Sequence, residues 1–311
     1  MFIINNYLNY IIRAYICKPF LFEISMENKI KIAIQKSGRL SEDSLDLLKS
    51  CGIKINTGLN KLKTTAENFP LEIFFLRDDD IPKYVADGVA DIGIVGENVL
   101  LENSNQVKLI KKTGFGKCRL SIAIPRDKTY KTNKSLNGLK IATTYPIILK
   151  KYLKANRIKA DIHEISGSVE IAPSIGLADA ICDLVSSGST LLSNGLKEVE
   201  VVLKSEAVII QNKSLSKEKE QLIEQLIFRI DSLQGAKNNK YILLNAPNNK
   251  LKSICNLLPG MKSPTILPLA KEGWSSIHSV IKEDDFWEII MKLKNAGAQG
   301  ILVVPIEKMI I

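Results

Sequence analysis

Four hydroxyl residues around one glycine form the segment of the sequence best suited to hold a phosphate group: Ser186, Ser187, Gly188, Ser189 and Thr190. Their hydroxyls and successive backbone N–H groups can form an anion nest. Gly188 can adopt a positive φ, and a helix beginning at Leu191 would add the positive end of its dipole. By itself, such a run is more often an ordinary polar turn.

Acidic residues upstream change this interpretation. Glu170, Asp179 and Asp183 precede the run, and residues 181–185 predict a buried strand that leads into it. Carboxylates there can accept hydrogen bonds from sugar hydroxyls or hold Mg²⁺ through water; the alternative is solvated charge at helix ends. A carboxylate before a hydroxyl loop at the carboxyl end of a strand suits a ribose phosphate, so we interpret the segment as a ribose-phosphate site.

Three other loops follow expected strands and carry polar or charged residues. Residues 35–39 (QKSGR) contain Lys36 and Arg39, which can meet a polyphosphate, Arg in bidentate fashion. The alternative is a charged loop without a ligand. The acids of residues 77–80 (RDDD) can cap the helix that follows. Residues 91–98 (DIGIVGEN) place two glycines near a third strand end.

These loops depend on an alternation of strands and helices, which predicts an open α/β sheet. In the first block we expect strands at 29–34, 71–76 and 92–95, a helix capped by Ser41, and a helix at 80–88. A second α/β block begins near Gly114, with strands at 120–124, 140–143, 161–165 and 181–185 and a helix at 146–155. Strands at 199–203 and 207–211 would return the chain to the first block. Two crossings would give hinged lobes with a cleft between them.

The last part of the chain has a different pattern. A long amphipathic helix at 216–232 is followed by six elements in the order β-α-β-β-α-β between 241 and 305. That order predicts a ferredoxin-like unit.

Composition restricts the function classes. The 311 residues suit two or three domains, and the net charge of +10 comes from scattered lysines without a basic arm, which argues against nucleic acid. Five cysteines, an odd number without metal-type spacing, indicate reduced thiols and a cytoplasmic location. The sequence has only two histidines, His163 and His278, which argues against a zinc site or a His-based catalytic triad. Residues 1–25 are too interrupted by charge to span a bilayer. They are either an added peripheral element or, as we expect, an extension before a natural start at Met26.

At this point the sequence resembles a known family. Residues 170–191 (EIAPSIGLADAICDLVSSGSTL) resemble the signature of ATP phosphoribosyltransferase, the first enzyme of histidine biosynthesis. The resemblance runs from about Lys29 to the end, through QKSGRLSEDS, RDDDIP, ADIGIVGENVL, GKCRLSIA, IATTYP, LLPGMKSPTILPLA and ILVVPIEKM. Residues 1–25 lie outside it. The terminal unit resembles the regulatory domain of the long form.

The resemblance implies a reaction and a fold. Ring nitrogen 1 of ATP attacks the anomeric carbon of 5-phosphoribosyl 1-diphosphate, giving N1-(5-phosphoribosyl)-ATP and pyrophosphate. It implies two hinged α/β lobes of periplasmic-binding-protein type and a ferredoxin-like (ACT-like) regulatory domain. The expected boundaries are 26–113 plus 199–236 for lobe I, 114–198 for lobe II and 237–311 for the regulatory domain.

The resemblance also implies roles for particular residues. Lys36, Arg39, Asp179 and Asp183 are the catalytic candidates, and Asp179, Asp183 and residues 186–190 would hold the phosphoribosyl group. Mg²⁺ would be held mainly through the substrate pyrophosphate, with Asp179 or Asp183 as candidate ligands. The candidates for the ATP side are Gln35, Lys36, Gly38, Arg39, Asp91, Gly93, Glu97, Arg119 and Tyr145.

Regulation and assembly follow from the same resemblance. It implies a homo-oligomer, from dimer to hexamer, that histidine inhibits, without membrane or nucleic-acid partners. The expected histidine site is near Pro264, Thr265, Ile277, His278 and Ser279. Two alternatives remain from the residues alone. A non-catalytic two-lobed solute-binding protein with a ligand-sensing domain has the same architecture. A basic nucleic-acid-binding protein would show salt-dependent affinity for DNA or RNA.

Overall fold

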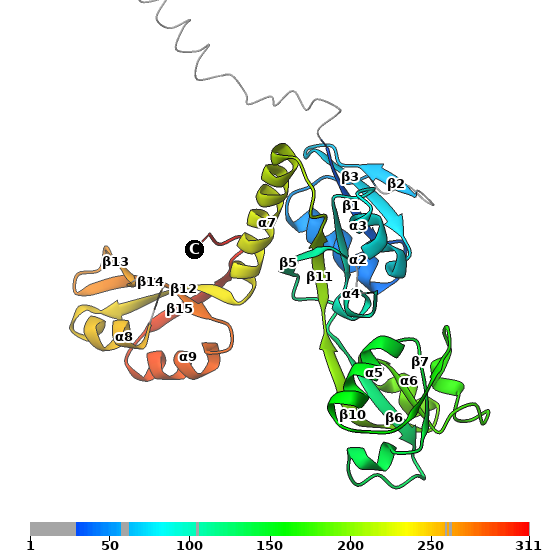
Figure 1. The fold of residues 1–311 in the computed structure, drawn as a ribbon. Helices are drawn as coiled ribbons and strands as arrows, with labels where there is room; N and C mark the ends of the chain where they lie inside the picture. Colours follow the sequence, from blue (N-terminus) through cyan, green and yellow to red (C-terminus); the bar gives the residue numbers. More distant parts are fainter. Residues whose placement is uncertain (1–28, 57–61, 104–105, 259, 261–262, 311) are drawn as a thin grey trace, which may run out of the picture. The chain divides into compact units, whose positions relative to one another are not determined.

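The structure is a computed structural model, and it describes residues 29–56, 62–103, 106–258, 260 and 263–310. The extension expected at 1–25 therefore lies outside the described residues. The chain divides into two compact units, drawn in Figure 1. The first comprises the described residues up to Glu42, Ile53–Ile110 and Gly116–Leu222; the second comprises Asp43–Gly52, Lys111–Phe115 and the described residues from Ile223 onward.

A six-stranded sheet, in the order β2-β3-β1-β4-β11-β5, forms the first α/β lobe. Its strands are β1 (Ile30–Gln35), β2 (Lys63–Thr65), β3 (Leu71–Leu76), β4 (Ile92–Gly96), β5 (Lys108–Lys112) and β11 (Ala207–Gln211). The central strands β3, β1 and β4 are parallel and rich in buried Ile, as expected for strands covered on both faces. The connecting elements are α2 (Arg39–Ser50), the 3₁₀ turn η1 (Asp78–Asp80), α3 (Ile81–Ala86) and α4 (Glu97–Asn103).

A mixed five-stranded sheet, in the order β10-β6-β9-β7-β8, forms the second lobe. Its strands are β6 (Cys118–Pro125), β7 (Lys140–Thr143), β8 (Asp161–Glu164), β9 (Ala180–Val185) and β10 (Leu196–Ser205). Strand β7 is parallel to β8 and β9, so their carboxyl ends meet at one edge. The helical elements are η2 (Asn133–Leu136), α5 (Pro146–Ala155), η3 (Val169–Ile171) and α6 (Ser189–Ser193).

The chain passes between the two sheets twice, as in lobes of the periplasmic-binding-protein type. The first passage lies at 113–117, between β5 and β6. The second differs from the expectation, because β10 pairs with β6 along its whole length and belongs to the second sheet. The chain returns at Glu206, whose carbonyl accepts a hydrogen bond from Glu97 N, and not at residue 199. Strand β11 then pairs with β4 in the first sheet.

The C-terminal part confirms the ferredoxin-like expectation. After α7 (Lys217–Lys237) come β12 (Asn239–Pro247), η4 (Asn248–Lys250), α8 (Leu251–Leu257), β13 (Thr265–Pro268), β14 (Trp274–Lys282), α9 (Phe286–Asn295) and β15 (Gln299–Pro305). The antiparallel order β13-β14-β12-β15 is that of a β-α-β-β-α-β unit. Helices α8 and α9 cover one face of the sheet (Figure 1). Ile254 and Leu293 pack there against Ile242 and Ile277.

Among the described residues, no helix is both long and apolar enough to cross a membrane.

Candidate functional site

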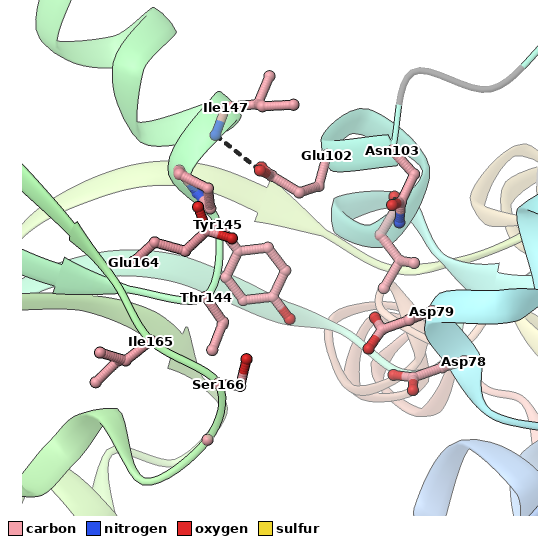
Figure 2. A pocket seen from close by; sticks show the side chains of 13 residues that line it. Asp78, Asp79, Glu102, Asn103, Thr144, Tyr145, Ile147, Glu164, Ile165 and Ser166 are labelled. Atoms are coloured by element: carbon pink, nitrogen blue, oxygen red, sulfur yellow. Dashed lines mark hydrogen bonds between the residues drawn. The ribbon is translucent and has the colours of Figure 1, made fainter.

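A cleft of about 670 Å³ lies where strands of the first unit end. Asp78 and Asp79 follow β3, Thr144 and Tyr145 follow β7, and residues 165–167 follow β8. Figure 2 shows the two aspartates facing Tyr145 and Ser166 across the opening. The remaining lining residues are Val99, Glu102, Asn103, Pro146, Ile147 and Glu164. Carboxyl ends of strands therefore supply most of the cleft, as ligand sites in α/β proteins require.

The acidic turn after β3 lines the cleft instead of capping a helix. Neither η1 nor α3 has a side-chain cap, so the capping expectation for residues 77–80 is wrong. Burial raises the pKa of Asp79, and the neighbouring charges of Asp78 and Asp80 raise it further. A cation or a hydrogen-bond donor in the cleft would relieve this unfavourable concentration of negative charge.

Tyr145 connects the acidic turn with the expected ribose site. Its hydroxyl accepts a hydrogen bond from Asn98 Nδ2 at 3.2 Å, and its backbone N–H donates to Thr143 Oγ1 at 2.9 Å. Burial raises the pKa of Tyr145, and the charge of Asp183, followed by those of Asp78 and Asp79, also raises it. Thr143 pairs with Cys182 across β7 and β9, so Asp183, the next residue of β9, lies near the same cleft.

Glu102 holds the first turn of α5 beside the cleft. Its two carboxylate oxygens accept hydrogen bonds from Ile147 N at 2.7 Å and Ile148 N at 2.9 Å. Figure 2 shows the bond to Ile147. Glu102 lies on α4, so this cap joins a helix of the first lobe to the helix that carries Pro146. A carboxylate at a helix N-terminus is favourable in charge as well as in hydrogen bonding.

The expected phosphate loop follows β9 as the sequence indicates. Gly188 has φ +83°, which confirms that the turn needs a glycine. The hydroxyls of Ser187 and Ser189 lie 3.0 Å apart, and the side chains of the loop are exposed. Helix α6 begins at Ser189, two residues before the expected Leu191, but spans only five residues, so its dipole contributes little.

Asp183 and Asp179 are separated by the strand between them. Burial raises the pKa of Asp183, and the nearby charge of Glu170 raises it further, although the hydrogen bond from Leu184 N lowers it. Asp179 precedes β9, is exposed, and accepts a hydrogen bond from Lys140 N at the start of β7. At about 3.3 Å per residue the two aspartates are about 13 Å apart along the strand. The structure brings Asp183, but not Asp179, to the loop.

The QKSGR loop lies beside the acidic turn. Gln35 pairs with Leu76, and Lys36 N donates to Leu76 O at 2.7 Å. Residues 36–39 are exposed, and α2 begins at Arg39 after Gly38, which has φ +90°. Ser41, expected as the cap, lies inside the helix, and its N–H donates to Gly38 O. The basic loop and the acidic turn thus share one edge of the first sheet.

The three candidate ATP-site residues within residues 91–98 do not lie together in the structure. Asp91 lies at the amino end of β4, is 3% exposed, and binds Lys31 N at 2.7 Å and Lys219 Nζ at 2.8 Å. Gly93 lies within β4, where an added Cβ would be 2.6 Å from Ile81 Cγ2, so its role is close packing of α3. Only Glu97, which begins α4 after β4, lies at the carboxyl edge.

Arg119 contacts the start of the loop after β9 and does not line the cleft. Its Nε and Nη2 atoms donate to Glu198 at 2.5 and 2.6 Å, and its Nη1 donates to Ser186 O at 3.1 Å. The guanidinium therefore donates its hydrogen bonds to protein acceptors. Its contact with Ser186 O holds the first residue of the loop and does not place Arg119 on a ligand.

The residues expected to bind histidine divide between the two faces of the C-terminal sheet. Ile277 (0% exposed) and Ser279 (5%) face the helices, and Ser279 Oγ is a buried atom without a hydrogen-bond partner among the described residues. His278 lies on the other face, where Tyr241 Oη and Ser276 Oγ contact its ring nitrogens at 2.8 and 3.0 Å. Thr265 pairs with His278 across β13 and β14, and Pro264 immediately precedes β13.

Several cleft residues were missed from the sequence. Residues 164–167, at the end of β8, were available from the rule that ligands meet carboxyl strand ends. The cleft residue Glu102 and the supporting residues Asn98 and Glu198 had no such signal, because their partners are 45, 47 and 79 residues away in the chain.

The fold and the cleft define a two-lobed α/β protein with a small-molecule site and an appended ferredoxin-like domain. The family model described as ATP phosphoribosyltransferase matches residues 77–232, and the model of the HisG C-terminal domain matches 236–308. The ATP phosphoribosyltransferase of Cytophaga hutchinsonii is 60% identical over 285 residues, which cover 92% of this chain and all of the relative. That of Bacteroides thetaiotaomicron is 57% identical over 282 residues, which cover 91% and 100%.

A solved structure agrees with these sequence relatives. The ATP phosphoribosyl transferase (HisG:HisZ) complex from Thermotoga maritima contains a chain 29% identical to this one, with a TM-score of 0.55 over 65% of this chain and 98% of that chain. The chain belongs to the ATP phosphoribosyltransferase family, in its long form with a C-terminal domain. It is a transferase of the first step of histidine biosynthesis.

Proposed function

We propose that the cleft and the neighbouring loop carry out this step as follows. The anomeric carbon of 5-phosphoribosyl 1-diphosphate lies near Asp183, and ring nitrogen 1 of ATP attacks it while pyrophosphate leaves. The observation that carries this assignment is Tyr145, which lines the cleft and whose N–H donates to Thr143 Oγ1. The Thr143 hydroxyl in turn donates to Cys182 O, next to Asp183 and the loop. Such a reaction needs positioning and charge neutralisation more than a covalent nucleophile.

The phosphoribosyl side consists of Asp183 and residues 186–190. The hydroxyls and the Gly188 turn would hold the 5-phosphate, and Asp183 with Glu170 would accept hydrogen bonds from the ribose hydroxyls. Support comes from the positive φ of Gly188 and from the proximity of Glu170 to Asp183. Asp179 is left out of this side because it lies at the other end of β9.

The ATP side consists of Tyr145 and the edge of the first sheet. Tyr145 would stack on adenine, while Lys36 and Arg39 would meet the phosphates and the leaving pyrophosphate, with Gln35, Gly38 and Glu97 beside them. Exposed cations can neutralise leaving-group charge only if the substrate reaches them, and residues 36–39 are exposed. Asp91, Gly93 and Arg119 serve the fold in this assignment.

Mg²⁺ fits the charge of the site. The residues that line the cleft include four acids, Asp78, Asp79, Glu102 and Glu164, and no Lys or Arg, while both substrates are polyanions. Within the described part of the chain, no group of three or more His, Cys, Asp or Glu is placed to hold a metal ion. Mg²⁺ would therefore be held mainly by the pyrophosphate, with Asp183 as the protein ligand, and would supply charge neutralisation.

An assay of the full chain tests the assignment. Protein incubated with Mg²⁺, ATP and 5-phosphoribosyl 1-diphosphate should form pyrophosphate and an N1-substituted adenine, which ultraviolet absorbance detects. Folded, reduced protein that forms neither product contradicts the proposal. A solute-binding protein of the same architecture would bind a ligand without turnover.

For regulation, we propose that histidine binds residues 237–311 on the exposed face of the sheet. Thr265 and His278 lie on that face, whereas Ile277 and Ser279 are covered by helices and out of reach of a ligand. The same face carries the exposed apolar side chains of Leu302 and Val304, which suits contact with another copy in a dimer or hexamer. Histidine bound to this domain inhibits a cleft in the other unit only if it favours one global arrangement of the protein.

The proposed domains are lobe I at 26–113 with 206–236, lobe II at 114–205 and the regulatory domain at 237–311. The part of α7 from Ile223 onward is assigned to lobe I by sequence order, although it clusters with the second compact unit. The proposed location is the cytoplasm. Cys51, Cys118, Cys182 and Cys255 are free thiols, as a reducing compartment maintains them.

A further inference from the structure

Strand β10 carries two glutamates, Glu198 and Glu200, whose side chains lie on opposite faces of the sheet. Residues two apart on a regular strand share a face. Here the register with β6 shifts between them, so that Glu198 lies opposite Ala123 and Glu200 opposite Ile122. This β-bulge, with one extra residue on β10, redirects one of the two carboxylates.

Glu198 lies on the face that carries the phosphate loop. Its carboxylate accepts both hydrogen bonds of the Arg119 fork and one from Ser121 Oγ at 2.8 Å. The hydrogen bond from Arg119 is the main reason that the pKa of Glu198 is lowered. An Arg–carboxylate fork fixes direction as well as distance, because both groups are planar.

The fork acts on the loop through the remaining nitrogen of Arg119. Nη1 donates to Ser186 O at 3.1 Å, at the point where β9 ends and the loop begins. On the paired strands β6 and β9, Arg119 lies opposite Val185, and Ser121 lies opposite Asp183. Glu198 is therefore linked through Arg119 to the start of the loop, and through Ser121 to the strand position opposite Asp183.

Glu200 has a comparable network on the other face. It accepts hydrogen bonds from Tyr130 Oη and, at 3.2 Å, from Tyr152 Oη. Both tyrosines pack against the cluster that contains Leu149 and Leu153 of α5. Burial and the charge of Glu200 raise the pKa of Tyr152 to about 12. This network supports the core of the lobe. Within the described part of the chain, the hydrogen bonds of Glu200 go to these two tyrosines and not to the loop, which makes Glu200 a matched control.

We propose that Glu198 is a positioning residue for the phosphoribosyl substrate. It orients Arg119, which holds Ser186 O and so sets the entry of the loop at residues 186–190. The proposal rests on the proposed function of that loop. Its consequence is selective: loss of the Glu198 charge releases the loop and weakens binding of 5-phosphoribosyl 1-diphosphate, while the ATP side, on other elements, is preserved.

The test compares Glu198→Gln with Glu200→Gln in the full chain. Steady-state kinetics with each substrate varied gives the two KM values, and calorimetry gives the affinity for 5-phosphoribosyl 1-diphosphate without turnover. We expect Glu198→Gln to raise the KM and Kd for this substrate about tenfold, the scale of one charge-assisted hydrogen bond, with the KM for ATP changed less than about twofold. Glu200→Gln should leave both KM values within about twofold of wild type.

A double-mutant comparison separates positioning from general damage. Arg119→Leu should raise the same KM by a similar factor, and the variant with both substitutions should be no worse than either alone, because the two residues act as one unit. Equal changes in both KM values, additive effects, or the same loss in Glu200→Gln would overturn the proposal. Wild-type protein that binds 5-phosphoribosyl 1-diphosphate without turnover contradicts the proposed function; the calorimetric comparison of the variants still decides the role of Glu198.

Discussion

Asn98 Nδ2 donates a hydrogen bond to the hydroxyl of Tyr145 across 47 residues of chain, and Asn98 Oδ1 accepts one from Ser205 Oγ at 2.9 Å. Asn98 is buried at the start of α4, and Ser205 ends β10, next to the return passage. One amide thus fixes Tyr145 relative to the passage between the sheets. The ring of Tyr145 lines the cleft, while its hydroxyl serves this internal network.

Two substitutions at Tyr145 separate these roles. Tyr145→Phe keeps the ring and should lower the free energy of unfolding by about 1 kcal/mol, the usual value of one hydrogen bond, with little change in the KM for ATP. Tyr145→Ala also removes the stacking surface and should raise that KM between about fivefold and 150-fold. Urea unfolding and steady-state kinetics measure the two effects. An equal KM for ATP in both variants would refute stacking on adenine.

Gly188 offers a second matched pair. An added Cβ would meet only Val185 Cγ1 at 3.9 Å, so space is available and the cost of Gly188→Ala is the positive φ, about 1–2 kcal/mol of stability. Gly188→Asp adds a negative charge beside the proposed phosphate and should weaken binding of 5-phosphoribosyl 1-diphosphate by at least about a hundredfold, since like charges in contact cost several kcal/mol. Calorimetry measures both. Retained affinity in Gly188→Asp would exclude this loop as the phosphate site.

The ionised side chain of Asp183 should lower the free energy of unfolding while it helps to bind 5-phosphoribosyl 1-diphosphate. Its pKa is raised in the folded protein, mainly by burial and then by Glu170, so the ionised side chain destabilises the fold above that pKa. As the pH falls through the raised pKa toward the unfolded value, the folded protein takes up the proton and this destabilisation disappears. Asp183→Asn should therefore be more stable than wild type at pH 7, with a difference that shrinks in acid, and should bind 5-phosphoribosyl 1-diphosphate at least about tenfold more weakly.

Urea unfolding at several pH values checks the first part of this prediction, and calorimetry checks the second. A variant that is less stable than wild type at neutral pH would show that the Asp183 carboxylate is stabilised in the fold. Such a result would contradict the inference that the Asp183 carboxylate lowers stability and is present for substrate binding.

The two faces of β14 give a test of regulation. His278→Ala should raise the concentration of histidine needed for half inhibition by at least about tenfold, because His278 lies on the exposed face that a ligand can reach. Ser279→Ala, on the covered face, should leave inhibition unchanged and should not destabilise the protein, since Ser279 Oγ has no partner among the described residues. Inhibition assays with the full chain distinguish the two. The reverse pattern would place the effector between the sheet and its helices.

Much of the fold follows from local signals in the sequence. The run of Leu71–Leu76 and the helix Pro146–Ala155 have the predicted limits, and Gly188 has the expected backbone conformation. Hydrophobic period, proline and glycine act over a few residues, so they are readable without tertiary contacts. The ferredoxin-like order is readable for the same reason, because it is a sequence of such elements.

The sequence by itself therefore determined the order of the elements, the loop with its glycine turn, and the resemblance to a family. Only the tertiary structure decided which charged side chains share an edge or a face. Asp179 and Asp183 are four residues apart yet lie toward opposite ends of β9, and Glu198 and Glu200 are divided by a bulge that depends on pairing with β6. Register is set by partners far away in the chain, and one extra residue moves a side chain to the other face, so no local pattern carries this information.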